Sequence, residues 1–376
     1  MSEEEKKQPM KLTSADVLNG ESPLVLTATL EPIAGDRFQP AGFPEIGHVI
    51  YKAPRKDKDG NPTTENVCIV DSAASMANHL ESVCQRGAHD LDLVDELVGM
   101  PYIRCVTGDL VDDKLPSGRR EVVVTSLTEG HRIASSYFLD GFPLNRDGVK
   151  TDIKLESDFV KRFGIVLPGS SKAHPPADKW WDVFKTIFEV DPNSLVHGLL
   201  FPQWQIKIPR ALTAHLEALG AGRVDRAGVK FDRLGKTTSG QPIFAVDDAT
   251  AESIRATFVL DISLIRSFGR KKGNEQLGLS NKQQEFLVAL ALWKIQKLLE
   301  SPFRFRSGCH LRNVSLKSGK RDVEIDVNIK SAIDAATFPN GITDVFWPRE
   351  ELYRPGKEGD GDKQNTDEDG ESGETE

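Results

Sequence analysis

The residues best suited to chemistry stand where a predicted strand turns sharply into a predicted helix, in VCIVDSAASMANHLESVC. Asp71 or Ser72 can cap the helix start, and the polar side chains that follow fall on its solvent face. A helix N-terminus carries free amide hydrogens and partial positive charge, which favour a phosphate group. An ordinary capped helix has the same pattern. The residues expected to contact phosphate are Ser72, Ser75, Asn78 and His79.

A hydrolase is a second interpretation of the same segment. Ala73 to Ala77 has the small-x-Ser-x-small spacing of a nucleophile elbow, which would make Ser75 the nucleophile. Ser75 falls inside the predicted helix, however, and no HGGG-like oxyanion segment precedes it. The pattern therefore disfavours a serine hydrolase. Its candidate bases are His197, His215 and His310.

A second candidate segment, RSFGRKKGNEQLG, carries four positive charges within seven residues. Gly269 and Gly273 permit close approach of the backbone, and Phe268 offers a ring for base stacking. A solvated basic loop has the same composition. The residues expected to contact RNA here are Arg266, Phe268, Arg270, Lys271 and Lys272.

A third segment, FRFRSGCHLR, predicts a strand with two different faces. Phe303 and Phe305 share one face and can pack on the preceding long helix, while Arg304 and Arg306 share the other. A row of guanidiniums suits a sugar-phosphate backbone. The competing interpretation pairs these arginines with acids of the next strand, Asp322, Glu324 and Asp326. The residues expected to contact RNA are Arg304, Arg306 and Arg312.

Weaker candidates are Arg37 and Gln39, on a loop rich in glycine and proline, and His131 and Arg132 in EGHRIASSY. Taken alone, His131 is better explained as a hydrogen-bonded core residue. The sequence contains no HExxH, paired Cys/His spacing, DxDxDG, GxGxxG or GxxxxGK[ST] motif. We therefore expect no metal, no cofactor and no catalytic activity.

An α+β framework must position these segments, because strands and helices alternate unevenly along the chain. Ser280 and Gln283 form a capping box at the start of the clearest helix. Predicted strands are 24–30, 48–54, 67–70, 102–107, 121–127, 256–265, 303–311, 314–317 and 322–329. Predicted helices are 73–84, 157–163, 178–190, 210–219 and 281–299.

Composition indicates a soluble protein, with 38% hydrophobic and 28% charged residues and no apolar run long enough to cross a bilayer. The acidic start is unlike a secretory signal, and four scattered cysteines suit a reducing cytoplasm. Residues 356–376 hold nine acids and two lysines, so −7 of the net charge of −9 lies there. We expect a flexible leader over 1–20, one domain over 21–355 and a disordered acidic tail over 356–376.

Together these segments resemble a known family. GDRFQPAGFPEIGHVIY, VCIVDSAASMANHLESVC, EGHRIASSYFLDG, SLVHGLLF, IRSFGR and FRFRSGCHLR are similar to the backbone subunit of type I-G (formerly I-U) CRISPR Cascade complexes. That family belongs to the Cas-seven group of the RAMP superfamily. The resemblance covers residues 24–329, and the VDSxxSMANxLE block is its most specific part.

The resemblance implies a modified RRM-like (ferredoxin-like) palm with inserted finger and thumb elements. It implies a non-catalytic subunit that polymerises along the crRNA guide and presents guide bases to a target DNA strand. Implied partners are further copies of the chain, the large subunit and the subunit that processes and caps the guide end. The thumb candidate is residues 224–246, with 168–179 as the runner-up. A generic RNA-binding module and a serine hydrolase are the alternatives.

Overall fold

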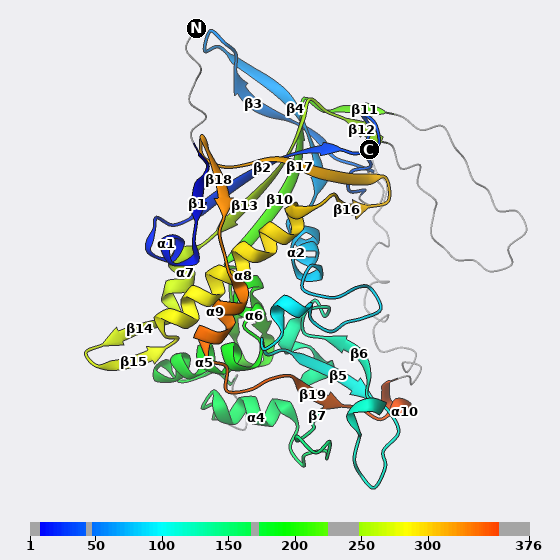
Figure 1. Ribbon diagram of the computed structural model, residues 1–376, viewed down its shortest axis with the longest axis vertical. Helices are drawn as coiled ribbons and strands as arrows, with labels where there is room; N and C mark the ends of the chain where they lie inside the picture. The colour runs from blue at the N-terminus through cyan, green and yellow to red at the C-terminus, as the bar shows by residue number, and fades with distance from the viewer. Residues whose placement is uncertain (1–7, 43–46, 167–172, 225–247, 353–376) are drawn as a thin grey trace, which may run out of the picture.

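The structure, a computed structural model, describes residues 8–42, 47–166, 173–224 and 248–352. These residues form a mixed α+β fold, as the sequence predicts. Figure 1 shows a large sheet, a layer of helices beneath it and a smaller sheet at the far end of the molecule. No helix within the described ranges is long and apolar enough to span a membrane.

The large sheet follows the order β1-β18-β17-β2-β13-β10-β4-β3. A ninth strand, β16, pairs with the first residues of β17. In this sheet neighbouring strands are antiparallel except for β1 and β18, which are parallel. The bounds are β1 Met10–Leu12, β2 Leu24–Pro32, β3 Ile50–Lys56, β4 Pro62–Asp71, β10 Leu212–Leu219, β13 Ser253–Leu260, β16 Phe303–Arg306, β17 Cys309–Ser318 and β18 Arg321–Ile325.

The centre of this sheet is built in the chain order β2, α2, β10, β13, α8, β17. The four strands lie in the spatial order β17-β2-β13-β10, and both helices lie on one side of them (Figure 1). Burial alternates residue by residue along β10 and β13, because the face toward the helices is covered and the other is half-exposed. The two helices are α2 (Ala73–Ser82) and α8 (Asn281–Glu300).

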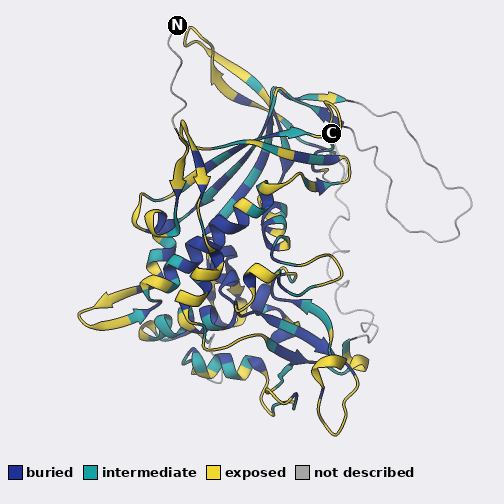
Figure 2. Cartoon of the chain, in the orientation of Figure 1, coloured by how far each residue is buried: buried dark blue, intermediate teal, exposed yellow. Residues whose placement is uncertain are grey.

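Helix α8 is the axis of the core. Its 20 residues span about 30 Å, and Ser280 and Gln283 form the predicted capping box. Residues 286–295 are buried throughout, as the dark segment in Figure 2 shows. The other α-helices of the described residues are α1 Ser14–Asn19, α3 Ser136–Leu139, α4 Leu155–Arg162, α5 Trp180–Val190, α6 Asn193–His197, α7 Ile262–Ser267, α9 Ile329–Ala336 and α10 Arg349–Leu352.

The smaller sheet has the order β6-β5-β19-β7, with β5 and β19 parallel. Three hairpin-like pairs complete the described strands: β8 with β9, β11 with β12 and β14 with β15. All four cysteines are buried and free of disulfides. The bounds are β5 Ile103–Thr107, β6 Glu121–Thr125, β7 Phe142–Pro143, β8 Leu199–Phe201, β9 Ile206–Ile208, β11 Gly222–Val224, β12 Asp248–Thr250, β14 Gly269–Lys272, β15 Glu275–Gly278 and β19 Thr343–Phe346.

Four predictions of secondary structure are wrong. The segment predicted as a single strand over 303–311 forms two antiparallel strands, β16 and β17, joined by a turn. Residues 210–219 were expected to be helical, but Leu212–Leu219 is a strand because it pairs on both edges, with β13 and β4. The strand predicted over 256–265 ends at Leu260, where Asp261 caps α7. The strand predicted over 322–329 ends at Ile325, and Ile329 opens α9.

The prediction of a flexible leader over 1–20 is wrong for residues 10–19. Strand β1 pairs with β18, and Thr13 caps α1, which buries Val17 and Leu18. The acidic tail (356–376) and the thumb candidate (224–246, apart from Val224) lie outside the described residues. The runner-up thumb segment, 168–179, is described only from residue 173 onward.

Candidate nucleic-acid interface

The start of α2 is fixed by a cap and a buried carboxylate. The Ser72 hydroxyl accepts a hydrogen bond from the Ser75 amide at 3.2 Å, which confirms the predicted cap. Asp71, the last residue of β4, is 1% exposed and accepts from three side chains. These are Ser75 Oγ at 3.0 Å, His79 Nε2 at 3.0 Å and Arg306 Nη2 at 2.7 Å. Two sequence segments more than 200 residues apart therefore meet at one carboxylate.

The electrostatics of this cluster favour the charged form of Asp71. Burial by itself would raise the pKa of Asp71, but the His79 hydrogen bond, the Arg306 charge and the Ser75 hydrogen bond outweigh it. The pKa of Asp71 is consequently held below its ordinary value. The cluster contributes stability that is lost as pH falls through this lowered pKa.

The same geometry disfavours Ser75 as a nucleophile. In a Ser-His-Asp triad the serine and the carboxylate contact opposite ring nitrogens. Here His79 Nε2 lies 3.4 Å from Ser75 Oγ and 3.0 Å from Asp71 Oδ2, so one nitrogen faces both groups. Within the described residues, none of the histidines considered as bases is hydrogen-bonded to Ser75.

Strand β16 packs on α2 through its phenylalanines. The rings of Phe303 and Phe305 each lie 5.3 Å from the His79 ring, edge to face. The expectation that these rings pack on the preceding long helix is thus replaced by a contact with α2. A β-bulge falls between Arg304 and Arg306, so the two arginines part: Arg304 is exposed, whereas Arg306 turns to Asp71.

The competing interpretation, in which these arginines pair with acids in and beside β18, is also wrong. Asp322 pairs with Lys317 and Asp326 with Lys11. Arg306 pairs with Asp71 instead, and Arg312 pairs with Glu31 on β2. Arg306 and Arg312 do have acidic partners, but these come from β4 and β2 rather than from the next strand in the sequence.

The loop of Arg37 and Gln39 reaches the same region. The Gln39 amide donates to Gly308 O at 2.9 Å, in the turn between β16 and β17. The Ala41 amide donates to Val70 O at 2.9 Å, one residue before Asp71. Arg37 is exposed and its Nη1 lies 3.6 Å from Asp248. The loop therefore borders both the α2 start and the β16–β17 turn.

The basic segment 266–272, which was also expected to contact RNA, lies away from Ser72 and Arg304 and does not form one groove with them. It forms the end of α7 and strand β14, beside the N-terminal end of α8, whereas α2 and β16 lie toward the other end (Figure 1). Arg266 donates to the carbonyls of Leu18 and Gly20.

Phe268, expected to stack on a base, is 1% exposed and packs on Phe184 instead, 5.0 Å between centroids. Arg270 lies over the Trp181 ring at 5.5 Å, and Lys271 and Lys272 are exposed. Two of the five residues expected to contact RNA here therefore serve the fold instead. Arg266 holds the chain at the end of α1, and Phe268 packs in the core.

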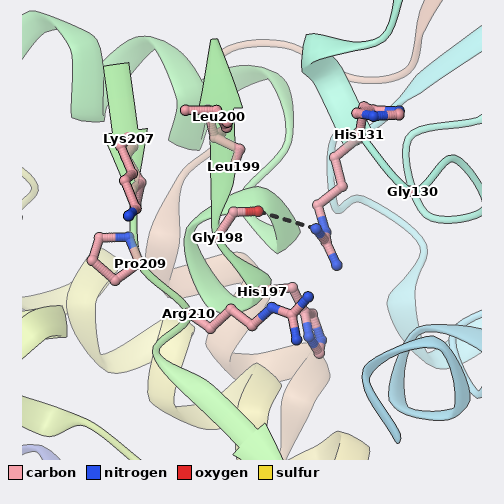
Figure 3. Close-up of a pocket in the computed structure, with 11 residues that line it drawn as sticks. Gly130, His131, His197, Gly198, Leu199, Leu200, Lys207, Pro209 and Arg210 are labelled. Carbon is pink, nitrogen blue, oxygen red and sulfur yellow. Dashed lines mark hydrogen bonds between the residues drawn. The ribbon is translucent and has the colours of Figure 1, made fainter. Parts of the chain in front are cut away.

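The burial of His131 and Arg132 is the reverse of what the sequence suggests. The His131 side chain is 81% exposed and pairs with Glu129, so the core assignment is wrong. Arg132 is buried, with Nε and Nη2 each 2.8 Å from the Glu81 carboxylate of α2. Its Nη1 donates to Gly198 O at 3.1 Å (Figure 3). Arg132 therefore joins α2 to the segment after α6.

A cavity that sequence reasoning missed opens beside this arginine. Its volume is about 340 Å³, and Arg210 on its wall donates to Ala73 O at 3.5 Å, in the first turn of α2. Two of the segments that carry the family resemblance, EGHR and VHGLL, meet here. Their place in that resemblance was the one feature of the sequence that could have indicated this cavity. The lining residues are Gly130, His131, Arg132, His197, Gly198, Leu199, Leu200, Lys207, Ile208, Pro209 and Arg210.

A comparison with known protein families identifies the family of this chain. The family model of CRISPR-associated protein GSU0053 matches residues 24–223, more than half of the chain. The chain belongs to this family. It is a Cas7-type Cascade family, so the chain is a CRISPR-associated (Cas) subunit. A search of curated proteins gives no match.

The matched part of this CRISPR-associated chain contains the α2 start, the loop of Arg37 and Gln39, and the whole cavity. The β14–β15 hairpin and the arginines of β16 and β17 lie beyond it. Among the described residues, no three His, Cys, Asp or Glu side chains gather as metal ligands would.

Proposed function

We propose that this Cas protein is the backbone subunit of a type I-G Cascade, which binds guide crRNA by its sugar-phosphate chain. The observation that carries the proposal is the meeting of three predicted segments around Asp71. There Ser75, His79 and Arg306 share one carboxylate, and the loop of Gln39 borders them. The helix start and exposed Arg304 then face solvent as phosphate donors.

The proposal includes an RRM-like palm. The order β17-β2-β13-β10, traversed as β-α-β-β-α-β with both helices on one face, supports it. In such a subunit, copies stack along the guide and leave base edges free to pair with a target DNA strand. The proposed partners are crRNA, target DNA, further copies of the chain, the large subunit and the guide-processing subunit, in the cytoplasm.

We propose no catalytic step. The bonding of Ser75 supports this, since its hydroxyl donates to Asp71 and the neighbouring His79 turns the same ring nitrogen to both groups, unlike a catalytic triad. A fluorophosphonate probe should leave Ser75 unlabelled. Labelling that disappears in Ser75→Ala would favour the hydrolase instead.

The function is tested by the RNA that copurifies with the protein. The full chain, expressed with its CRISPR array and purified, should carry short RNA of discrete length and repeat-derived sequence. Random RNA fragments would favour a generic RNA-binding module, and absence of RNA would contradict the proposal. The variant Arg304→Gln tests the site itself, because Arg304 is exposed and has no acidic partner among the described residues, with weaker RNA binding as the expected result.

A further inference from the structure

The cavity beside Arg132 has an unbalanced charge. Its described lining residues include Arg132, Lys207, Arg210 and two histidines, and no aspartate or glutamate. Arg132 is neutralised by Glu81 beneath the cavity wall. Within the described residues Lys207 has no ion pair, and the one polar contact of Arg210 is the carbonyl of Ala73. Two exposed cations thus border a concave site without an acidic partner.

His197 supplies a donor at the floor. It is fully buried, and its Nε2 lies 3.0 Å from Lys294 Nζ. Burial, together with the charges of Lys294, Arg132 and Arg210, lowers the pKa of His197 well below its ordinary value, so the ring is neutral. Because a lysine ammonium only donates, Nε2 accepts and Nδ1 carries the proton. That Nδ1 has no hydrogen-bond partner in the described structure.

An unpaired buried donor destabilises the folded chain, and an acceptor from a ligand would offset this cost. Figure 3 shows the Arg210 guanidinium beside the His197 ring, on the wall of the cavity. His197 and Arg210 thus both belong to the lining of the cavity. A group with several acceptor oxygens and negative charge fits both.

The backbone around the cavity is held in unusual conformations. Gly198 has φ +76°, and a Cβ there would lie 2.7 Å from Ile208 O and 2.9 Å from Arg210 N. Only glycine lets the segment that carries Arg210 approach so closely. Arg132 has φ 51°, a left-handed conformation uncommon for a residue with a side chain, and is fixed by Glu81 and Gly198. Gly198 and Arg132 thus fix the backbone around the cavity at two positions.

We propose that the cavity binds a phosphodiester of the RNA strand, with Lys207 and Arg210 as cations and His197 as donor. This rests on the proposed RNA-binding function and extends it to residues that the sequence did not indicate. The volume of about 340 Å³ accommodates a phosphate with its sugar. Arg210 contacts Ala73 O, so the wall of the cavity touches the first turn of α2.

The test measures single-stranded RNA binding of the full chain at several salt concentrations. Lys207→Gln with Arg210→Gln should lower the salt slope by about 1.4, which is about 25-fold in affinity at 0.1 M salt if the lines converge at 1 M. The matched control is Lys320→Gln with Arg321→Gln, which removes one exposed lysine and one exposed arginine from the β17–β18 turn. The control should leave the slope within about 0.5.

The outcomes separate the two proposals. If the wild-type chain binds RNA and the cavity variant keeps its slope, the cavity inference is overturned while the function stands. If the wild-type chain does not bind RNA, the proposed function fails. A second experiment measures thermal stabilisation by inorganic phosphate. If the chain does not bind RNA, and phosphate stabilises the wild type but not the cavity variant, the site binds a free anion and the phosphodiester assignment is overturned.

Discussion

The surroundings of α2 and the β14–β15 hairpin both concentrate basic residues, but they use them differently. Near α2, Arg306 and Arg132 pair with Asp71 and Glu81, which are 1% and 4% exposed. On the hairpin, the described structure gives the cations no ion pair, only the contact of Arg270 with a tryptophan ring. Paired arginines hold elements together, whereas unpaired ones remain available to a polyanion. A count of charges in a sequence window cannot separate the two.

The largest effect should come from Arg132→Met. It leaves Glu81 buried with only the Asn193 amide as a partner, so the free energy of unfolding should fall by about 3–5 kcal/mol. Urea unfolding of the full chain measures this. Arg270→Met is the hairpin control and should stay within about 0.5 kcal/mol of wild type. A loss below about 1 kcal/mol for Arg132→Met would remove the distinction drawn above.

The second-largest effect should be a pH dependence of the free energy of unfolding, caused by the buried carboxyl group of Asp191. Burial is the main cause that raises the pKa of Asp191 to about 6, with Glu81 adding to it and the Ser194 hydrogen bond opposing it. A raised pKa means that this group favours folding below about pH 4 and that the contribution is lost as pH rises through about 6.

Relative to Asp191→Asn, wild type should therefore lose up to about 3 kcal/mol between pH 4 and pH 7. Urea unfolding at a series of pH values gives the difference. Parallel stability curves for the two proteins would show that Asp191 is charged throughout.

Ser72→Ala sharpens the comparison at a single cap. Loss of the hydroxyl that accepts from the Ser75 amide should cost about 1 kcal/mol of unfolding free energy. Ser82→Ala, at the other end of α2, removes a hydroxyl that only donates to the His79 carbonyl. It should change stability by about 0.5 kcal/mol or less, and equal effects of the two variants would argue against the cap.

The smallest effect on folding should come from Arg270→Gln with Lys271→Gln, because the hairpin is exposed. Stability should remain within about 0.5 kcal/mol of wild type. The hairpin lies toward the far end of α8 from the cavity, so we expect this pair to lower the RNA salt slope by less than the cavity pair does. An equal or larger decrease would place the hairpin on the main RNA surface and break the comparison.

Local signals in the sequence located the α2 start well, because a cap and a strand-to-helix switch are short-range features. The cap of α2 was narrowed to Asp71 or Ser72 and proves to be Ser72, and the capping box of Ser280 and Gln283 was predicted to the residue. Packing decided the rest. Leu212–Leu219 is rich in good helix formers, but its alternation has the period of the strand that β4 and β13 pair with.

The site was predicted less completely, for the same reason. Arg306 could not be assigned to Asp71 without the bulge in β16, and Phe268 reads as exposed until α5 covers it. The cavity depends on Gly198, where a backbone conformation brings Arg210 close to His197. No periodicity encodes such an approach, although the two segments that build it were already part of the family resemblance.

The smaller sheet has a consequence for how the chain is made. Its inner strand β5 takes β19 as a parallel neighbour, and Asp344 of β19 binds both Arg104 and Arg120. During synthesis these two arginines leave the ribosome more than 200 residues before their carboxylate does. That sheet must stay unfinished until nearly the whole chain has emerged, so a nascent chain stalled before Thr343 would expose the edge of β5 to whatever else can pair with it.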